Sequence, residues 1–277
     1  MVRRLGLLVL CTLFLLCGCA QTKESPILEM ICLDVGQGSA TLLRTPEGDV
    51  LIDAGGDGSQ NALCRKLKAL GVERLALLIL THPDEDHIGG ADGVLEQFEI
   101  DAVWTNGAVA ETECFLMFER MVRAKETSVD TVRAGDGITL GSMHLSILSP
   151  FAQLSWDENE ESLVLLLRCG SFGALLMGDV GMKRERAILE TYGGAHLDVD
   201  VLCAAHHGSN TSSDTSFLDA ATPQYVVISC GAGNPDGHPD GRALARLQGT
   251  GAEICRTDLE GDISFSVFEN TYTYSKK

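Results

Sequence analysis

The stretch that decides the fold and the chemistry of this chain reads THPDEDHIGG and runs from Thr81 to Gly90. It places two imidazoles and three carboxylates within six residues and ends in two glycines. The preceding residues, 75–80, are all apolar and predict a fully buried strand. Polar residues at the end of such a strand, on a loop that leads into a helix, are where α/β proteins place their chemistry. Histidine nitrogens beside carboxylate oxygens suit a divalent metal such as zinc or manganese.

The alternative interpretation of this stretch is an acidic, solvated loop with two incidental histidines. A buried strand seldom ends in a His-x-Asp-x-Asp-His run by chance, and other strand ends in the chain supply matching ligands. We therefore interpret the run as the centre of a metal-dependent hydrolase.

The N-terminus has the composition of an export signal. Arg3 and Arg4 form a short basic region, and residues 5–16 form an apolar stretch too short to span a bilayer comfortably. The run LCGC that follows resembles a bacterial lipobox, with Gly18 before the cleavage point and Cys19 as the lipidated residue. An uncleaved membrane anchor is the alternative, and both interpretations place the rest of the chain at the extracytoplasmic face of the cell membrane. The predicted organisation is a signal peptide over 1–18, a lipidated linker over 19–26 and a hydrolase domain over 27–277.

The charge of the chain argues against several classes of partner. The formal net charge is −18, and it becomes −20 once a leader carrying Arg3 and Arg4 is removed. A surface of this sign repels polyanions at long range and offers no polybasic patch to a membrane. Broad electrostatic binding of nucleic acid is therefore not expected, whereas a metal-centred site that acts on one phosphate is compatible with the charge.

The cysteines do not indicate a disulfide framework. Three of the ten belong to the leader and the lipobox, and the remaining seven are an odd number that cannot all pair within one chain. None lies in a CxxC or Cys/His zinc spacing. Cys32, Cys169, Cys203 and Cys230 stand in apolar runs and are expected to be small buried side chains. One or two disulfide bridges among these cysteines are nevertheless compatible with the sequence.

Hydrophobic periodicity predicts alternating strands and helices along the whole domain. The expected strands are 28–35, 40–43, 50–53, 75–80, 103–104, several within 132–149, then 162–168, 174–177, 199–204, 225–229 and further ones within 254–268. The expected helices are 63–70, 91–98, 115–125, 182–192, 217–221 and 242–247. Two successive strand-rich halves with helices between them indicate an α/β fold, a four-layer αββα sandwich in which two apolar sheets face each other.

Three further polar clusters follow apolar strands. Asp53 begins the run DAGGD, Asp179 closes the run MGD, and His206 and His207 lie in the run AHHGS. Strand ends can converge in space even when they are far apart in sequence. These groups are therefore expected to join the histidines and carboxylates of residues 82–87.

Together these clusters resemble the metallo-β-lactamase superfamily, and within it the extracellular hydrolase domain of ComEC-type DNA-uptake proteins. The resemblance rests on His82, Asp84, Asp86 and His87, on the GD pair at 178–179 and on the HHGS run at 206–209. It covers residues 28–268 in the expected order, through LDVGQG at 33–38, LIDAG at 51–55, Asn159, SLVL at 162–165, Asn234, GHP at 237–239 and RTD at 256–258. It implies the metallo-β-lactamase fold and hydrolysis, without specifying a substrate.

The resemblance also implies a role for each ligand. His82 and Asp84 would hold one metal; Asp86, His87 and His206 would hold a second. Asp179 would bridge the two, and a water between the metals would be the nucleophile. Asp86, His207 and His238 are the residues predicted to act in catalysis.

Two departures from the superfamily pattern affect the metal. Asp84 stands where the common run has histidine, and Asn159 stands near the place of a histidine usual before the second sheet. Both changes make the first site richer in oxygen ligands, which favours manganese or magnesium over zinc or leaves that site empty. One or two divalent ions, manganese or zinc, are expected.

Several residues admit two roles. Asp34 and Asp53 could ligate, but capping turns and orienting ligand histidines fits them at least as well. Gln37 with Gly38 could shape the rim of the site or form a plain tight turn. His207 could ligate, shuttle a proton or, with Ser209, bind phosphate; the family pattern favours its neighbour His206 as the ligand.

The predicted substrate contacts also have structural alternatives. Asn159, Ser162 and Ser209 are predicted to face the substrate, whereas the alternative is that the first two order the loop before a strand. His238 is a candidate to stabilise the transition state, and its alternative is a loop histidine packed by Pro239.

The function expected from these features is a membrane-anchored extracellular hydrolase, a phosphodiesterase or nuclease with single-stranded DNA as a candidate substrate. The alternatives are a phosphoesterase for cell-wall or lipid headgroups and a non-catalytic surface binding lipoprotein. No nucleotide cofactor is expected, because the chain has no Gly-rich dinucleotide loop and no P-loop. The sequence does not predict an oligomeric state.

Overall fold

The computed structural model describes residues 25–151 and 159–276. The predicted signal peptide and Cys19 lie outside the described residues. The strands are β1 (Leu28–Cys32), β2 (Thr41–Thr45), β3 (Gly48–Ile52), β4 (Arg74–Leu75), β5 (Leu77–Leu80), β6 (Glu99–Ile100), β7 (Ala102–Thr105), β8 (Ser128–Thr131), β9 (Gly137–Leu140), β10 (Met143–Ser149), β11 (Val164–Cys169), β12 (Phe172–Leu176), β13 (Val201–Cys203), β14 (Tyr225–Ile228), β15 (Glu253–Arg256), β16 (Ile263–Val267) and β17 (Tyr272–Lys276).

The helices of the same residues are α1 (Gln60–Ala69), α2 (Glu85–Ile88), α3 (Ala91–Gln97), α4 (Glu113–Lys125), α5 (Met182–Tyr192), α6 (Gly194–Leu197), α7 (Thr215–Ala221), α8 (Gly241–Gln248) and α9 (Thr257–Glu260). Two short 3₁₀ helices, η1 (Asn159–Glu161) and η2 (Ala205–Gly208), complete the list.

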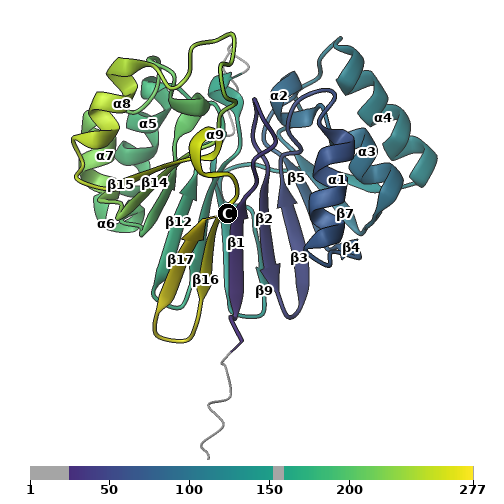
Figure 1. Cartoon of the computed structure of the whole chain (residues 1–277), viewed down its shortest axis with the longest axis horizontal. Helices are drawn as coiled ribbons and strands as arrows, with labels where there is room; N and C mark the ends of the chain where they lie inside the picture. The colour runs from purple at the N-terminus through teal and green to yellow at the C-terminus, as the bar shows by residue number, and fades with distance from the viewer. Residues whose placement is uncertain (1–24, 152–158, 277) are drawn as a thin grey trace, which may run out of the picture.

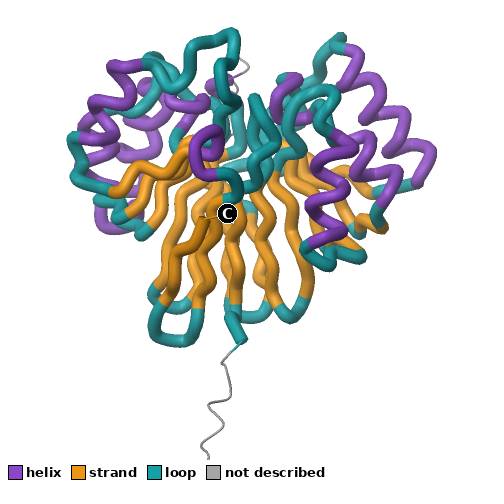
Figure 2. The backbone as a smooth tube through the Cα atoms, viewed as in Figure 1, coloured by secondary structure: helices purple, strands orange, loops and turns teal. Residues whose placement is uncertain are grey.

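Two sheets face each other and helices cover their outer faces. The first sheet has the order β17-β16-β1-β2-β3-β5-β7-β8, and the second has the order β15-β14-β13-β12-β11-β10-β9. Helices α1, α3 and α4 lie on one side of the molecule, and α5, α7 and α8 lie on the other (Figures 1 and 2). One apolar cluster fills the space between the sheets, and two more fill the spaces between each sheet and its helices. The predicted four-layer αββα sandwich is confirmed.

Strand β5 shows why the sequence before the motif is apolar without alternation. Leu77 and Ile79 point into the cluster between the sheets, whereas Leu78 and Leu80 point into the cluster under the helices. A parallel strand covered on both faces needs an apolar residue at every position. Each such side chain contributes about 1.5–3 kcal/mol when fully buried, so this strand is a rigid support for the residues that follow it.

Strand direction brings the polar strand ends together. Strands β3, β5, β7 and β8 run parallel in the first sheet, as do β12, β13, β14 and β15 in the second. The carboxyl ends of parallel strands meet at one edge of a sheet, where α/β proteins place their ligands. Asp53, Thr81, Asp179 and Ala205 all follow such ends.

The structure differs from the sequence prediction at a few elements. The first strand ends at Cys32 rather than at residue 35, and Phe172 lies in β12 rather than in a turn. The edge strands β8 and β17 were not predicted. The cysteines of the described residues are all free, although Cys32 Sγ lies 3.8 Å from Cys203 Sγ across the two sheets.

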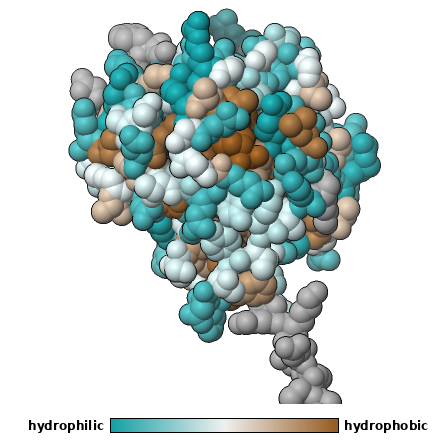
Figure 3. Space-filling view, turned by 60° about the vertical axis from the view of Figure 1, so that its left-hand side comes forward, coloured by the Kyte–Doolittle hydropathy of each residue, from teal (hydrophilic) through white to brown (hydrophobic). Residues whose placement is uncertain are grey.

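Hydrophobic residues at the surface are interspersed among hydrophilic ones on the face shown in Figure 3. Among the described residues, no helix is long and apolar enough to cross a membrane.

Glu185 on α5 is a buried acid that makes stability depend on pH. Its carboxylate accepts hydrogen bonds from the backbone N–H groups of Ser213 at 2.8 Å and Asp214 at 2.6 Å. Burial raises its pKa to about 7, and the two backbone hydrogen bonds only partly oppose this. Because an unfolded glutamate titrates near 4.5, the folded state binds more protons than the unfolded state between these two values.

The free energy of unfolding is therefore expected to fall as pH rises from about 4.5 to 7, by at most about 3 kcal/mol from this group. Urea unfolding of wild type and Glu185→Gln at pH 5 and pH 8 measures this contribution, because the variant cannot titrate there. Glu190→Gln, on the exposed side of the same helix, should keep the wild-type difference. Equal pH dependence in wild type and Glu185→Gln would contradict the prediction.

Candidate metal centre

The motif residues are held by a close packing of two loops. His82 follows β5 and is buried, while Asp86 and His87 lie on the short helix α2. The two glycines after this helix are required by space: a Cβ at Gly89 would lie 2.2 Å from the backbone nitrogen of Asp57. A Cβ at Gly90 would lie 2.2 Å from the carbonyl oxygen of Ala54. The glycines therefore allow the loop after β3 to pack directly on the motif.

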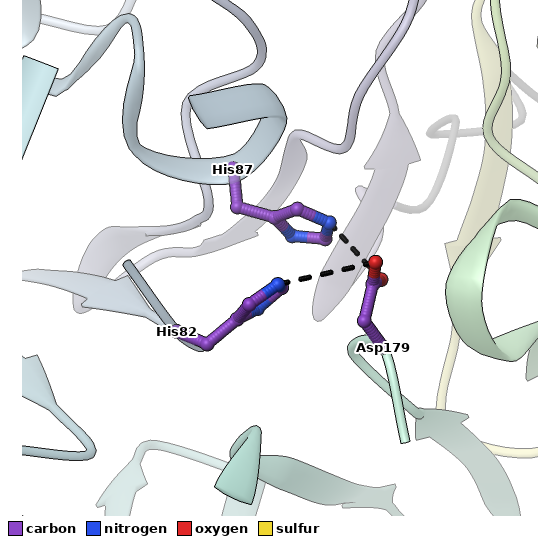
Figure 4. Close-up of side chains that lie close together, drawn as sticks. All are labelled: His82, His87 and Asp179. Atoms are coloured by element: carbon purple, nitrogen blue, oxygen red, sulfur yellow. Dashed lines mark ion pairs between the residues drawn. The ribbon is translucent and has the colours of Figure 1, made fainter. Parts of the chain in front are cut away.

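Two histidines of the motif meet Asp179 from the second sheet. Ligand atoms of His82, His87 and Asp179 all lie within 4.8 Å of one another. The Nε2 atom of His87 is 3.0 Å from Asp179 Oδ1, and that of His82 is 3.9 Å from Asp179 Oδ2. Figure 4 shows both rings pointing at the carboxylate, which comes from the turn after β12. We call this group the first cluster.

A second cluster adjoins the first and shares His87 with it. It consists of Asp86, His87 and His207, again with ligand atoms within 4.8 Å of one another. The Nε2 atom of His207 is 3.1 Å from Asp86 Oδ2, 3.1 Å from His87 Nε2 and 3.7 Å from Asp179 Oδ2. Asp179 thus belongs to the first cluster and also faces His207 of the second, and its bridging role stays a prediction.

The far side of each ring is fixed by a hydrogen bond, which orients the near side. His87 Nδ1 donates to Asp53 Oδ2 at 2.7 Å, and His207 Nδ1 donates to the carbonyl of Ser229 at 2.8 Å. His82 Nδ1 contacts Thr81 Oγ1 at 3.0 Å, and that hydroxyl in turn donates to Asp53 at 3.0 Å. Asp53 thus orients ligand histidines, the second of the two roles considered for it, as carboxylates next to metal-bound histidines do.

These contacts fit a divalent metal. With Nδ1 donating, each ring presents the lone pair of Nε2 towards the shared carboxylates. The Nε2 atom of His82 is buried without any hydrogen-bond partner in the structure. A buried nitrogen without a partner is costly, and a cation between His82, His87 and Asp179 would satisfy it. Histidine and carboxylate donors are ligands that zinc and manganese both accept.

The electrostatics of the centre keep the carboxylates ionised, whereas a metal would have to displace the proton that the raised pKa of His87 retains. Burial alone would raise the pKa of Asp179, but His87 and His207 hold it well below its usual range. Burial would likewise raise the pKa of Asp86, but the hydrogen bond from His207 and the charge of His87 lower it. Burial would lower the pKa of His87, whereas the carboxylates of Asp179 and Asp53 raise it well above its usual value. The carboxylates are thus kept ionised, as metal ligands must be.

Two predicted ligands lie next to the clusters rather than within them. The Oδ2 atom of Asp84 is 3.6 Å from His82 Nε2, and its side chain is 36% exposed. The Nε2 atom of His206 is 3.7 Å from Asp179 Oδ2, and its side chain is 25% exposed. Both line an open cleft of about 870 Å³ together with Asp86, Asp179 and His238.

The turn that carries both histidines explains why sequence reasoning could not choose between them. His206 and His207 have φ values of +50° and +53°, a conformation that is rare outside glycine. The N–H of His206 donates to the carbonyl of Gly178 at 2.9 Å, which ties this turn to the one before Asp179. His207 is consequently buried in the second cluster and His206 faces the cleft. The assignment of His206 as the ligand stays a prediction, and the geometry favours His207.

The predicted substrate contacts lie away from the cleft wall formed by the described residues. Ser162 is fully buried, and its hydroxyl accepts a hydrogen bond from the N–H of Asp179 at 3.2 Å. Asn159 begins η1, and its carbonyl accepts from the N–H of Ser162 at 3.0 Å. Ser209 is buried and lies 3.0 Å from Thr211 Oγ1. In this structure these groups shape the loops that hold the ligands.

The sequence did not predict two specific hydrogen bonds that Gln37 makes at the rim of the cleft. Gln37 Nε2 donates to Asp86 Oδ2 at 3.5 Å, and its Oε1 accepts from the N–H of Gly231 at 3.1 Å. This side chain therefore joins the rim to a predicted ligand, and the LDVGQG run was the only signal for it. Asp34 Oδ1 accepts from the N–H of Gly36 at 3.1 Å, which is a turn contact.

Comparison with known proteins agrees with this centre. The profile of the metallo-beta-lactamase superfamily matches residues 33–232, which include every member of both clusters. The chain belongs to the metallo-beta-lactamase superfamily. The superfamily fold implies that the chain binds a divalent metal and is a hydrolase, and the two His/Asp clusters are the candidate ligands.

Curated relatives within this superfamily are competence proteins. The chain is 30% identical to ComE operon protein 3 of Bacillus subtilis over 266 residues, which are 89% of this chain and 34% of that protein. It is 33% identical to competence protein ComA of Neisseria gonorrhoeae over 235 residues, or 84% of this chain and 31% of that protein. The chain thus spans about a third of the length of these relatives. The predicted resemblance to ComEC-type proteins is confirmed.

Solved structures agree with the metallo-beta-lactamase fold. Igni18, a metallo hydrolase from Ignicoccus hospitalis, matches with a TM-score of 0.59 at 17% identity, covering 87% of this chain and 100% of that one. The metallo-beta-lactamase fold protein YhfI from Bacillus subtilis matches with a TM-score of 0.57 at 13% identity, covering 91% of this chain and 100% of that one.

Proposed function

We propose that this hydrolase is a metal-dependent phosphodiesterase. The observation that carries the proposal is the pair of adjoining ligand clusters that share His87 and open, through Asp86 and Asp179, into the cleft. Two metals close together are suited to an in-line displacement at phosphorus, because the attacking and leaving oxygens both need stabilisation. Ions held there would supply Lewis acidity and acidify a water to act as nucleophile.

The side chains of this protein would hold the ions and position the substrate. His82 and Asp84 with Asp179 would hold one ion, and Asp86, His87 and His207 would hold the other. His238 lines the cleft, and its ring centroid lies 5.4 Å from that of His206. Burial and the two neighbouring histidines lower the pKa of His238, so its imidazole is neutral at pH 7. A neutral imidazole at the cleft can accept a proton from an attacking water or donate a hydrogen bond that orients the phosphate.

Two substrate classes fit this chemistry, each for a separate reason. Similarity to competence proteins supports single-stranded DNA, and hence a nuclease. The cleft wall supports a small phosphodiester, such as an ester of a cell-wall or lipid headgroup. Among the described residues, this wall carries Asp57, Glu85 and Asp236 besides the predicted ligands, and no lysine or arginine. A polyanion would meet repulsion there at every phosphate beyond the one at the metals.

The proposal is tested with residues 22–277, loaded with manganese or zinc and given bis(4-nitrophenyl) phosphate, single-stranded DNA and a headgroup phosphodiester in parallel. Turnover of any of the three that is abolished by a chelator and restored by metal supports a phosphodiesterase. The ranking of DNA against the headgroup ester identifies the class. No turnover of any of the three by fully metal-loaded protein would refute the phosphodiesterase proposal.

The metal preference is expected to favour manganese. Asp84, next to the first cluster, stands where the superfamily commonly has histidine, and oxygen ligands suit harder cations. Phosphodiesterase activity should therefore be higher with manganese than with zinc, and β-lactam hydrolysis should be slight with either. Asp84→His should shift the preference towards zinc, with Glu85→Gln on the same cleft wall as the matched control. Activity with zinc alone, together with ready opening of a β-lactam ring, would contradict the metal assignment.

The site of action is proposed to be the extracytoplasmic face of the cell membrane. The support is the LCGC run that ends at Cys19. Cys19→Ala protein is expected to lose its lipid, which mass spectrometry of the N-terminal peptide detects, and to leave the membrane fraction. A processed Cys19→Ala protein that still sediments with membranes would contradict lipid anchoring.

A further inference from the structure

An apolar cavity of about 220 Å³ adjoins the metal centre on the side of α4. Its wall is formed mainly by apolar side chains from β5, the motif, α2 and α4: Leu80, Pro83, Ile88, Phe115, Phe118 and Val122. His82 is also part of this wall. The cavity and the first cluster therefore share one side chain, and both lie at the edge where the parallel strands β5 and β7 end.

The mouth of the cavity is unusually apolar for the surface of this chain. Four large hydrophobic side chains are exposed among the described residues, and two of them, Val109 at 74% and Val129 at 41%, line the cavity. A third, Leu116 at 51%, is on α4 but does not line it. Apolar side chains that gather at a concave site indicate ligand binding rather than ordinary surface scatter.

Three polar side chains of the wall other than His82 are engaged by the protein. Asn106 Nδ2 donates to the carbonyl of Glu161 at 3.0 Å, and its Oδ1 accepts from the N–H of Ala108 at 3.0 Å. The guanidinium of Arg123 pairs with the carboxylate of Glu119 at 2.9 Å. The Asn106 amide is therefore held by the protein, and Arg123, whose side chain is 74% exposed, lies on the solvent side of the wall. An alkyl group needs no polar partner, and burying it removes apolar surface from water.

We propose that this cavity binds the alkyl ester group of a phosphodiester whose phosphate lies at the metal centre. The inference rests on the proposed phosphodiesterase function and narrows its substrate to a lipid-like ester. The position of His82 in both sites carries it, because a phosphate at the first cluster places an ester group beside the cavity wall. The acidic cleft on the other side of the motif would then receive the remaining part of the substrate.

The test is a series of methyl n-alkyl phosphates, from ethyl to decyl, titrated calorimetrically into the metal-loaded protein. Affinity should rise about fourfold per added methylene, as burial of each CH₂ requires, until the cavity is full, and should then level off. Val122→Phe fills the cavity from α4 and should flatten this rise while ethyl phosphate binding is unchanged. Leu116→Ser, on the same helix but outside the cavity, should keep the wild-type series.

The outcomes separate this inference from the proposed function. Hydrolysis of bis(4-nitrophenyl) phosphate with affinities indifferent to chain length would overturn the cavity assignment and leave the phosphodiesterase standing. A chain-length series abolished by Val122→Phe in a protein that hydrolyses nothing would support alkyl binding and remove the enzyme proposal. If Val122→Phe lowers the affinity for thymidine 5′-methyl phosphate as much as it lowers the affinity for the octyl ester, the cavity binds a base. That result would overturn the alkyl assignment.

Discussion

Asp179→Ala is expected to remove bound metal and to lower phosphodiesterase activity by at least ~100-fold, since even residues behind the ligands cost 10–100-fold. Its carboxylate is 3.0 Å from His87, 3.7 Å from His207 and 3.9 Å from His82, so one substitution disrupts both clusters. It also leaves three imidazoles together without the charge that balances a cation. Elemental analysis of dialysed protein measures the metal, and the model diester measures the activity.

The matched control for that experiment is Asp57→Ala. Asp57 lines the same cleft but contacts Gly58 and Gln60 rather than the clusters. It should keep wild-type metal content, whereas Asp179→Ala should not. Unchanged metal stoichiometry in folded Asp179→Ala protein would exclude a bridging role for this carboxylate.

The second large effect is expected from His207→Ala, compared with His206→Ala. His207 Nε2 lies within the second cluster and its Nδ1 is held by Ser229, so its loss should lower metal affinity by at least ~100-fold. His206 lies on the cleft side. Its substitution should lower metal affinity less than tenfold and should affect turnover more strongly than metal affinity. Metal titration followed by calorimetry separates the two variants.

The opposite result for the two histidine variants would reverse the assignment of the ligand. If His206→Ala loses the metal and His207→Ala keeps it, the family-based assignment is right and the turn must rearrange when metal binds. Circular dichroism of each variant shows whether the fold is intact, because both residues share one strained turn.

The parts of the fold that sequence predicted well are those with a buried face. The helix predicted over 182–192 and the apolar strands β11 and β12 were found because packing imposes a period on their residues. Strand β8 is exposed at every position, and it is held by its backbone pairing to β7 at the sheet edge. An edge strand of this kind has no hydrophobic pattern from which it could be predicted.

The candidate site also contains residues whose placement the sequence predicts and residues whose placement it does not. Asp53, His82, His87 and Asp179 follow buried strands, so their convergence could be inferred from strand direction. The choice between His206 and His207 depends on two left-handed backbone angles, which no local pattern in the sequence specifies. The roles of Ser162 and Gln37 depend on partners far away in the chain, and only the folded arrangement reveals such contacts.

The contact between the motif glycines and the loop after β3 limits how this site can be redesigned. A side chain at Gly38, Gly89 or Gly90 would strike main-chain atoms of the facing segment, so the floor of the centre offers a protein engineer no positions to vary. Variation is expected to be tolerated where the wall is built of side chains on an open loop and no role in the reaction is proposed, as at Pro235 and Asp236. A combinatorial library aimed at new substrates should therefore diversify those positions and the apolar wall on α4, and leave the metal floor untouched.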